Sequence, residues 1–202
     1  RLADRKVSER TIFFYPMSRT HVELAAAAMR GCGLRAAVMP DPDERAIELG
    51  RQVTGGDECY PSMLVFGSVL RLLESRAPSE IAILLPSADG PCRYGQYHVY
   101  LRKVLRDRGY SDVEVISPGT DDAYGALDSK ARRRLWWAMV AGDVLDALTT
   151  SERPYRCTTG SVQEVQEAAL RCCQQALGER PIEDLPRLLE AVALLLRTQR
   201  PD

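Results

Sequence analysis

Short runs of consecutive apolar residues recur along the first two-thirds of the chain, and each run ends at or just before a proline. Continuous apolar runs of this length are typical of strands that are buried on both faces of a parallel sheet. Proline interrupts them because it has no backbone N–H to donate to a neighbouring strand. The four expected strands are Thr11 to Pro16, Leu34 to Met39, Ile81 to Leu85 and Val113 to Ile116.

Segments with helical spacing separate these runs. The first begins with Thr20-His21-Val22-Glu23, the pattern of a capping box, and ends at Gly31 to Gly33. Further helices are expected over about 42–53, 61–74 and 93–108. Alternating strands and helices, with connections of a dozen residues or more, predict an α/β fold: a doubly wound four-stranded parallel sheet of Rossmann or flavodoxin type, with right-handed crossovers and strand order 2-1-3-4.

Only helices are expected in the last third of the chain, over about 128–149, 161–177 and 183–198. The last of these has an apolar face that requires a partner surface, which we expect from the sheet or from a further domain. The predicted organisation is a polar tail over 1–10, an α/β lobe over 11–178 and a C-terminal helix over 179–202. The start at Arg1 rather than at methionine suggests a piece of a longer polypeptide or a processed chain.

Composition narrows the class of protein. Hydrophobic residues make up 45% of the chain and charged residues 27%, and no apolar run approaches the ~20 residues that cross a bilayer. With 27 Lys and Arg against 28 Asp and Glu, the net charge is -1, so neither nucleic acid nor an anionic membrane is an expected partner. The basic run Arg132 to Arg134 is expected to be a solvated helix face. These features indicate a cytoplasmic protein whose function resides in a local site.

Several common site motifs are missing from the sequence. It contains no phosphate-binding loop, no dinucleotide fingerprint, no C-x-x-C and no H-E-x-x-H. His21 and His98 are the two histidines, and no G-x-S-x-G places a serine at a nucleophile elbow, so a Ser-His-Asp site is not favoured. His21 is expected either at the surface or in a crevice at the end of the first strand.

Cys59 and Cys92 are the most informative of the six cysteines. Each lies in a turn with glycine and proline, Gly55 to Pro61 and Asp89 to Tyr97, just before a predicted helix. Unpaired N–H groups at a helix N-terminus favour the thiolate, which is a good ligand for a soft metal. Both turns are expected at the carboxyl edge of the sheet, where open α/β folds bind ligands. The pair fits an iron–sulfur or zinc site, or two small residues at tight turns.

The residues around these two cysteines allow two interpretations. Arg93, Gln96 and His98 are close to Cys92 in sequence and are candidates to hydrogen-bond cluster sulfur, or they are ordinary residues at the start of an exposed helix. The three-residue spacing of Tyr94, Tyr97 and Tyr100 favours packing of a helix against the sheet. The remaining cysteines are expected to be core residues (Cys32, Cys172, Cys173), with Cys157 as a candidate third ligand.

Three motifs resemble, in order and spacing, the 2-hydroxyglutaryl-CoA dehydratase and benzoyl-CoA reductase-like family, in particular the region found in CoA-substrate-specific enzyme activases. The likeness spans about 11–177. The motifs are Glu58-Cys59-Tyr60-Pro61, Gly90-Pro91-Cys92-Arg93-Tyr94-Gly95-Gln96-Tyr97 and Ile116-Ser117-Pro118.

The resemblance implies an α/β lobe that binds a [4Fe-4S] cluster, with Cys59 and Cys92 as ligands, and passes electrons in a 2-hydroxyacyl-CoA dehydratase or reductase system. It implies as partners an ATP-hydrolysing activase domain or a second α/β lobe. A homodimer that shares the cluster would supply four cysteines. Two alternatives stay open: a metal-free scaffold that docks a partner through its C-terminal helices, and a zinc site that uses Cys59, Cys92 and a histidine.

Overall fold

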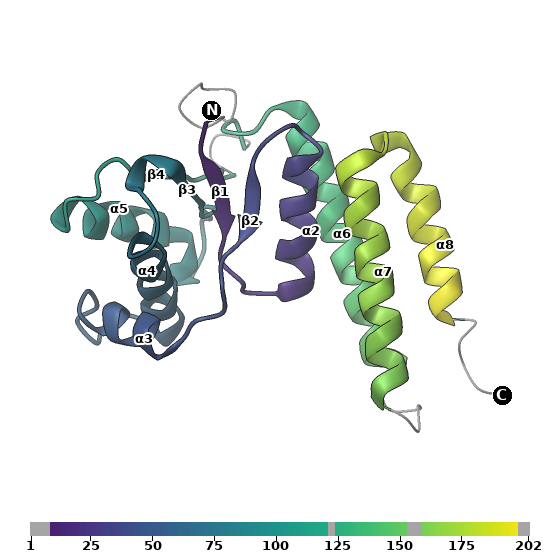
Figure 1. Cartoon of the computed structure of the whole chain (residues 1–202), viewed down its shortest axis with the longest axis horizontal. Coiled ribbons are helices and arrows are strands. Elements are labelled where there is room, and N and C mark those ends of the chain that lie inside the picture. Colours follow the sequence, from purple (N-terminus) through teal and green to yellow (C-terminus); the bar gives the residue numbers. More distant parts are fainter. Residues whose placement is uncertain (1–8, 121–123, 153–158, 198–202) are drawn as a thin grey trace. The chain divides into compact units, whose positions relative to one another are not determined.

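A computed structural model of the chain describes residues 9–120, 124–152 and 159–197. These residues contain a four-stranded sheet in the order β2-β1-β3-β4, with every pair of neighbours parallel (Figure 1). The fold class and the strand order predicted from the sequence are therefore confirmed. The strands are β1 (Thr11–Phe14), β2 (Ala36–Val38), β3 (Ile81–Leu84) and β4 (Glu114–Ile116).

Helices fill the connections between the strands and form the C-terminal part of the chain. The expected helices are all present, and their limits move by a few residues. They are α2 (Arg19–Arg30), α3 (Glu44–Arg51), α4 (Tyr60–Leu73), the 3-10 turn η1 (Pro78–Glu80), the 3-10 turn η2 (Arg93–Gln96), α5 (Tyr97–Asp107), α6 (Ser129–Glu152), α7 (Thr159–Glu179), the 3-10 turn η4 (Ile182–Asp184) and α8 (Leu185–Arg197).

The start of α2 differs from the expected capping box. Ser18, with an extended backbone, is the N-cap, and Thr20 lies inside the first turn with 9% of its surface exposed. The helix therefore begins before the Thr20 to Glu23 pattern. Thr20 is already part of the helix, whereas an N-cap residue has an extended backbone.

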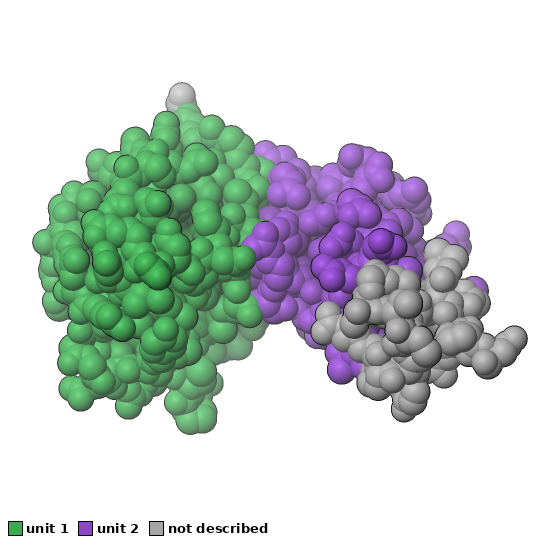
Figure 2. All heavy atoms as spheres, turned by 60° about the horizontal axis from the view of Figure 1, so that its bottom comes forward, with its two compact units in different colours: residues 1–17, 34–128 green, residues 18–33, 129–202 purple. Residues whose placement is uncertain are grey.

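By packing, the chain divides into two compact units, one within 1–17 and 34–128 and the other within 18–33 and 129–202 (Figure 2). The first contains the sheet. Phe13, Ile83 and Val115 lie next to one another in register across three strands. They form one core cluster with residues of α4 and α5, including Phe66 and Leu101. These apolar residues explain why the strands read as nearly continuous hydrophobic runs.

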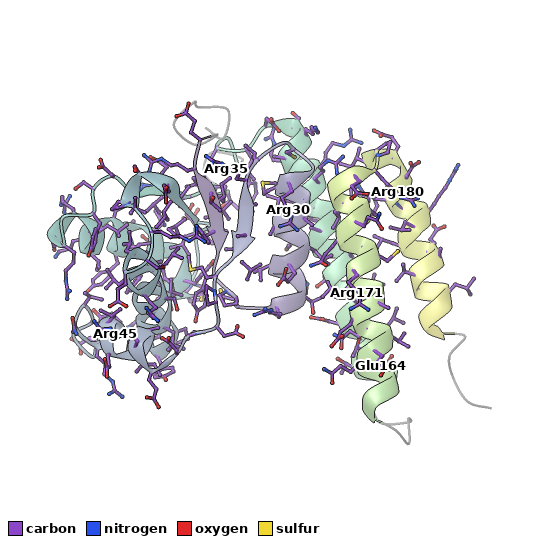
Figure 3. The ribbon with its side chains drawn as sticks, viewed as in Figure 1. Arg30, Arg35, Arg45, Glu164, Arg171 and Arg180 are labelled. Atoms are coloured by element: carbon purple, nitrogen blue, oxygen red, sulfur yellow. The ribbon has the colours of Figure 1, made fainter. Side chains whose placement is uncertain are left out.

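Helices α3 and α4 approach each other closely within the first unit. A Cβ on Gly67 would lie 1.8 Å from the carbonyl oxygen of Ala46, and a Cβ on Gly50 would lie 2.2 Å from that of Met63. The two helices can pack at this distance because glycine occupies both positions. At their surface, Arg45, which is labelled in Figure 3, forms ion pairs with Glu48 and Glu74, at 3.1 and 2.8 Å.

The second unit is a set of helices, in which α2 packs against α6 and α7, and α8 also packs against α6 and α7. Its core contains Leu24, Leu145, Cys173 and Leu189 among other residues. The partner of the apolar face of α8 is thus supplied by α6 and α7 of the same unit, rather than by the sheet or a further domain as expected. An amphipathic helix buries its apolar stripe on the nearest complementary surface, and here two neighbouring helices provide it.

Arg134 also departs from the expectation of a solvated basic face. It is only 7% exposed, and its guanidinium donates to the carbonyl oxygens of Leu177 and Arg180 at the end of α7. These carbonyls have no partner inside the helix, and a positive charge is favourable at a helix C-terminus. None of the helices among the described residues combines the length and the apolar character that a membrane crossing requires.

Candidate functional site

Cys59 is the N-cap of α4, with Pro61 in the first turn of the helix. The sequence folds this way because proline has no N–H to satisfy and its backbone angle suits a helix start. The hydroxyl of Ser62 donates to the Cys59 carbonyl oxygen at 2.7 Å, and the Ser62 N–H donates to the same oxygen at 2.9 Å. The thiol of Cys59 therefore sits, half-buried, at the positive end of the helix.

The Cys59 thiol contacts a buried tyrosine. Its Sγ lies 2.6 Å from the hydroxyl oxygen of Tyr97, the first residue of α5, which is 6% exposed. This hydrogen bond lowers the pKa of Cys59, and the nearby Ser62 lowers it further. Burial, followed by the bond to Cys59, raises the pKa of Tyr97. Both shifts have the direction expected when the tyrosine hydroxyl donates a hydrogen bond to the cysteine sulfur and so favours the thiolate form.

A second contact joins the two cysteine-bearing turns. The guanidinium of Arg93 donates to the backbone carbonyl oxygen of Asp57. Together with the bond between Cys59 and Tyr97, it holds the 55–61 turn against the 89–97 turn. The expectation that the two motifs come together is therefore confirmed. Arg93 acts as a link between the turns, through a backbone oxygen.

The 55–61 turn is closed by its own glutamate. The carboxylate of Glu58 accepts hydrogen bonds from the N–H groups of Gly55 and Gly56, at 2.9 and 3.1 Å. Backbone donors, its own N–H first, and the hydroxyl of Tyr100 lower the pKa of Glu58. Gly56 has a φ of 99°, in the left-handed region that favours glycine. The Gly-Gly-Asp-Glu segment thus forms a rigid turn that presents Cys59.

Cys92 occupies the matching position in the second turn. It is the N-cap of η2, and it is exposed. A charge on Cys92 raises the pKa of Tyr94 and also that of Tyr97, in both cases after the larger effect of burial, which takes the Tyr94 value to about 12. The two tyrosine rings pack edge to face with centroids 5.2 Å apart. Both cysteines therefore contribute to the raised pKa of Tyr97.

A glycine fixes the backbone of the second turn. A Cβ on Gly95 would lie 2.2 Å from the carbonyl oxygen of Ala88, so only glycine permits this approach. Gly90, with a φ of 150°, is another residue in the left-handed part of backbone space. Steric contact at Gly95 and the backbone angle at Gly90 therefore explain why the motif has glycine at these two positions.

The ends of the strands lie close to this site. Tyr15, which follows β1, has a pKa raised first by burial and then by the nearby Asp41 and Tyr60. Asp41 follows β2, and Tyr60 is the first residue of α4. The site thus lies at the carboxyl edge of the sheet, as the sequence predicted and as is usual for ligand sites in open α/β folds.

Gln96, His98 and His21 are the other residues that the sequence suggested for a site. Gln96 is exposed at the end of η2, and His98 is half-buried in the first turn of α5. Neither is shown in contact with Cys59 or Cys92, so their role at cluster sulfur stays a prediction. His21 belongs to the other unit, where it contacts aspartates of α6.

Four further cysteines had expected roles. Cys173 is buried with 1% exposure, as predicted, whereas Cys172 is exposed, so the prediction that both are core residues was wrong. The core stripe of α7 runs through Cys173 and Ala176, and the preceding residue faces outward because adjacent helical positions are about 100° apart. Cys32 is half-buried. Cys157 lies outside the described residues.

Tyr97 is the site residue that the sequence reasoning did not recognise. It was expected to pack a helix, and it does so against Phe66, at a centroid distance of 5.6 Å. The spacing of tyrosines could not reveal that the hydroxyl reaches a thiol 38 positions away. The available signal was its place in the same Gly-Pro-Cys motif, where Tyr97 follows Cys92 by five residues.

The donor set fits part of a metal site. Two cysteines, one of them with a lowered pKa, are soft ligands of the kind that iron–sulfur clusters and zinc require. The described residues contain no group of three or more His, Cys, Asp or Glu side chains placed to hold a metal ion. A cluster at this site would therefore need ligands from outside the described residues. Comparisons of the chain with protein-family models, with curated proteins and with solved structures gave no match.

Proposed function

We propose that Cys59 and Cys92 provide two thiolate ligands to an iron–sulfur cluster, of [4Fe-4S] type, and that the chain is an electron-transfer lobe. The proposed setting is a cytoplasmic 2-hydroxyacyl-CoA dehydratase or CoA-enzyme-activase-like system, whose dehydration or reduction chemistry other domains complete. The main support is the contact between Cys59 and Tyr97, because it favours a thiolate at the edge of the sheet where Cys92 also lies.

Several features of the first unit suit an electron-transfer site. The hydrogen bond from Tyr97 stabilises negative charge on the Cys59 sulfur, and charge at the ligand sulfurs is one determinant of a cluster's potential. The link between Arg93 and Asp57 fixes the two turns to each other. A fixed pair of ligands limits rearrangement when the charge of the site changes. A bound cluster would supply the one-electron chemistry.

The proposal requires partners, because two thiolates do not complete the four ligands of a cubane. The remaining ligands would come from a second α/β lobe or from a second copy of this chain. Since Cys92 is exposed, a partner surface has access to it. An ATP-hydrolysing activase domain would deliver the electrons.

The first experiment measures iron, zinc and acid-labile sulfide in protein purified without oxygen. Wild type is compared with Cys59→Ala, Cys92→Ser and the control Cys172→Ser, since Cys172 is an exposed cysteine on a helix of the other unit. We expect iron and sulfide in near-stoichiometric amounts in wild type and in the control, and their loss in the two site variants.

A mass measurement in solution accompanies the metal analysis. Iron in dimers, at one cluster for two chains, would identify a second copy as the source of the other ligands. If the protein contains zinc in place of iron and sulfide, the site is a zinc site and not a cluster site. If the Cys92→Ser protein keeps the iron content of wild type, Cys92 is not a ligand. Folded wild-type protein without metal, both alone and after anaerobic reconstitution with iron and sulfide, would contradict the proposal and favour a metal-free scaffold.

A further inference from the structure

A second cluster of reactive side chains lies in the other unit, at the start of α2. The hydroxyl oxygen of Ser18 is 2.7 Å from Nδ1 of His21. The opposite nitrogen of the same ring, Nε2, is 3.1 Å from a carboxylate oxygen of Asp143 on α6. Both distances lie within the range expected between a nucleophile and its base, and between the base and the group that orients it. Residues 122 positions apart in sequence thus form a Ser-His-Asp arrangement.

The partners of His21 assign its tautomer. A carboxylate accepts only, so in the neutral ring Nε2 is the nitrogen that donates to Asp143. Nδ1 is then free to accept the proton of the Ser18 hydroxyl. A second carboxylate, that of Asp146, lies 3.6 Å from Nδ1. It is placed to stabilise the positive charge that the ring gains when Nδ1 takes a proton from serine.

Packing holds the ring in place. The His21 side chain is 20% exposed, and a Cβ on Gly142 would lie 2.5 Å from its Cδ2 atom. The imidazole therefore lies directly against the backbone of α6, between Asp143 and Asp146. This contact fixes the plane of the ring, which a catalytic base needs and which an exposed histidine lacks.

Hydrogen-bond donors lie beside the serine. The first N–H groups of an α-helix have no partner within the helix, and Ser18 does not cap α2 with its side chain. The first turn of α2 also contains no acidic residue. The Ser18 hydroxyl is directed to His21 instead, and the N–H groups of the first turn of this 12-residue helix lie next to the nucleophile. Such donors stabilise an oxyanion.

We propose that Ser18 and His21 form a catalytic pair for acyl transfer, with Asp143 and Asp146 as positioning residues. The site is separate from the cysteine site and does not depend on the function proposed for it. It hydrolyses carboxylic esters. Asp143 and Asp146 make its surroundings negative, and the nearby Arg19 is paired with Glu23 at 3.5 Å, so a neutral ester is favoured over an anionic one.

The reaction has two halves and needs water as its co-reactant. The Ser18 oxygen attacks the carbonyl carbon while its proton moves to Nδ1 of His21. The bond to the leaving oxygen then breaks, and that oxygen takes the proton from Nδ1, which leaves the acyl group on Ser18. Water then attacks the acyl carbon in the same way. Its proton passes through Nδ1 to the serine oxygen, and a carboxylic acid is released. No oxidation state changes.

The test uses a fluorophosphonate probe, which phosphonylates activated serines, on the full chain. Mass spectrometry locates the modified residue. We expect modification at Ser18 in wild type, at least a tenfold loss of total labelling in Ser18→Ala, and no change in Ser129→Ala, a matched exposed serine at the start of α6. His21→Asn should slow labelling by about 100-fold, in line with loss of a general base.

Hydrolysis of a neutral ester, p-nitrophenyl acetate, measures turnover and tests the positioning role. Asp143 is 81% exposed, so water screens its effect, and Asp143→Asn should lower kcat by about tenfold with KM unchanged. The assay is run on a Cys59→Ala background, since a thiolate also attacks activated esters. Wild-type protein in which the probe does not modify Ser18, or a Ser18→Ala protein that hydrolyses the ester at the wild-type rate, would overturn the proposal whatever the iron content of the sample.

Discussion

Replacement of Tyr97 by phenylalanine tests the central contact of the cysteine site. The change removes one oxygen, 2.6 Å from Sγ of Cys59, and keeps the ring that packs against Phe66 and Tyr94. The apolar core around the ring should therefore stay intact. A hydrogen bond to a charged group contributes about 1.5–3 kcal/mol, and because Cys59 is half-exposed we expect the loss of about 1 kcal/mol in the free energy of unfolding.

This loss should depend on pH in a defined direction. The pKa of Cys59 is lower in the folded protein than its ordinary value of 9.0, so the unfolded chain holds the thiol proton to higher pH. Stability from this group therefore increases as the pH rises from the folded pKa toward 9.0, and is lost as the pH falls. Phenylalanine removes the largest cause of the shift. The difference between wild type and Tyr97→Phe should thus be larger at pH 9 than at pH 6.5.

Two measurements check the prediction. Urea unfolding, followed by far-ultraviolet circular dichroism at both pH values, gives the free energies. The rate of alkylation of Cys59 against pH, followed by mass spectrometry of its peptide, gives the midpoint for thiolate formation. We expect the midpoint to be higher in Tyr97→Phe than in wild type. Tyr110→Phe is the control, because that tyrosine packs against the same core cluster and lies outside both cysteine turns. Equal alkylation midpoints in wild type and Tyr97→Phe would refute the reasoning.

Two further predictions concern the packing of helices. Gly67→Ala should lower the free energy of unfolding by about 2 kcal/mol, because a Cβ 1.8 Å from the Ala46 carbonyl oxygen forces two backbones apart, and this overpacking outweighs the gain in helix propensity. Gly178→Ala, whose Cβ would meet its nearest atom at 3.9 Å, should be neutral or stabilising in the same thermal or urea unfolding experiment. Arg134→Met should cost about 2 kcal/mol, because it leaves two carbonyls at the end of α7 without their charged donor. Arg133→Met, at a side chain 64% exposed, should change unfolding by less than about 0.5 kcal/mol, and equal effects of the two substitutions would contradict the role assigned to Arg134.

The sheet was predictable because its information is local. A strand buried on both faces has to be apolar at successive positions, and the runs around Phe13, Ile83 and Val115 meet this condition. Parallel strands with helical connections then leave few topologies, and the order 2-1-3-4 was among them. The partner of α8 was not predictable in this way. An apolar stripe predicts that one face of a helix is covered, but it does not indicate which surface covers that face.

The two candidate sites differ in how far their sequence revealed them. Glycine and proline around Cys59 and Cys92 mark tight turns before helices, so both cysteines were recognised from local signals. The contact with Tyr97 crosses 38 positions and depends on how α4 and α5 lie on the sheet. Ser18 and His21 are three residues apart, but no sequence pattern pointed to Asp143.

The sequence by itself determined the α/β class, the strand order and the two cysteine turns, because periodicity, proline, glycine and helix starts act over a few residues. Only the tertiary structure decided that Tyr97 contacts Cys59, that Arg134 binds the end of α7, and that His21 contacts Asp143. The physical reason is the short range of these contacts. Hydrogen bonds between side chains act over about 3 Å, so they exist only where packing brings distant segments to that separation.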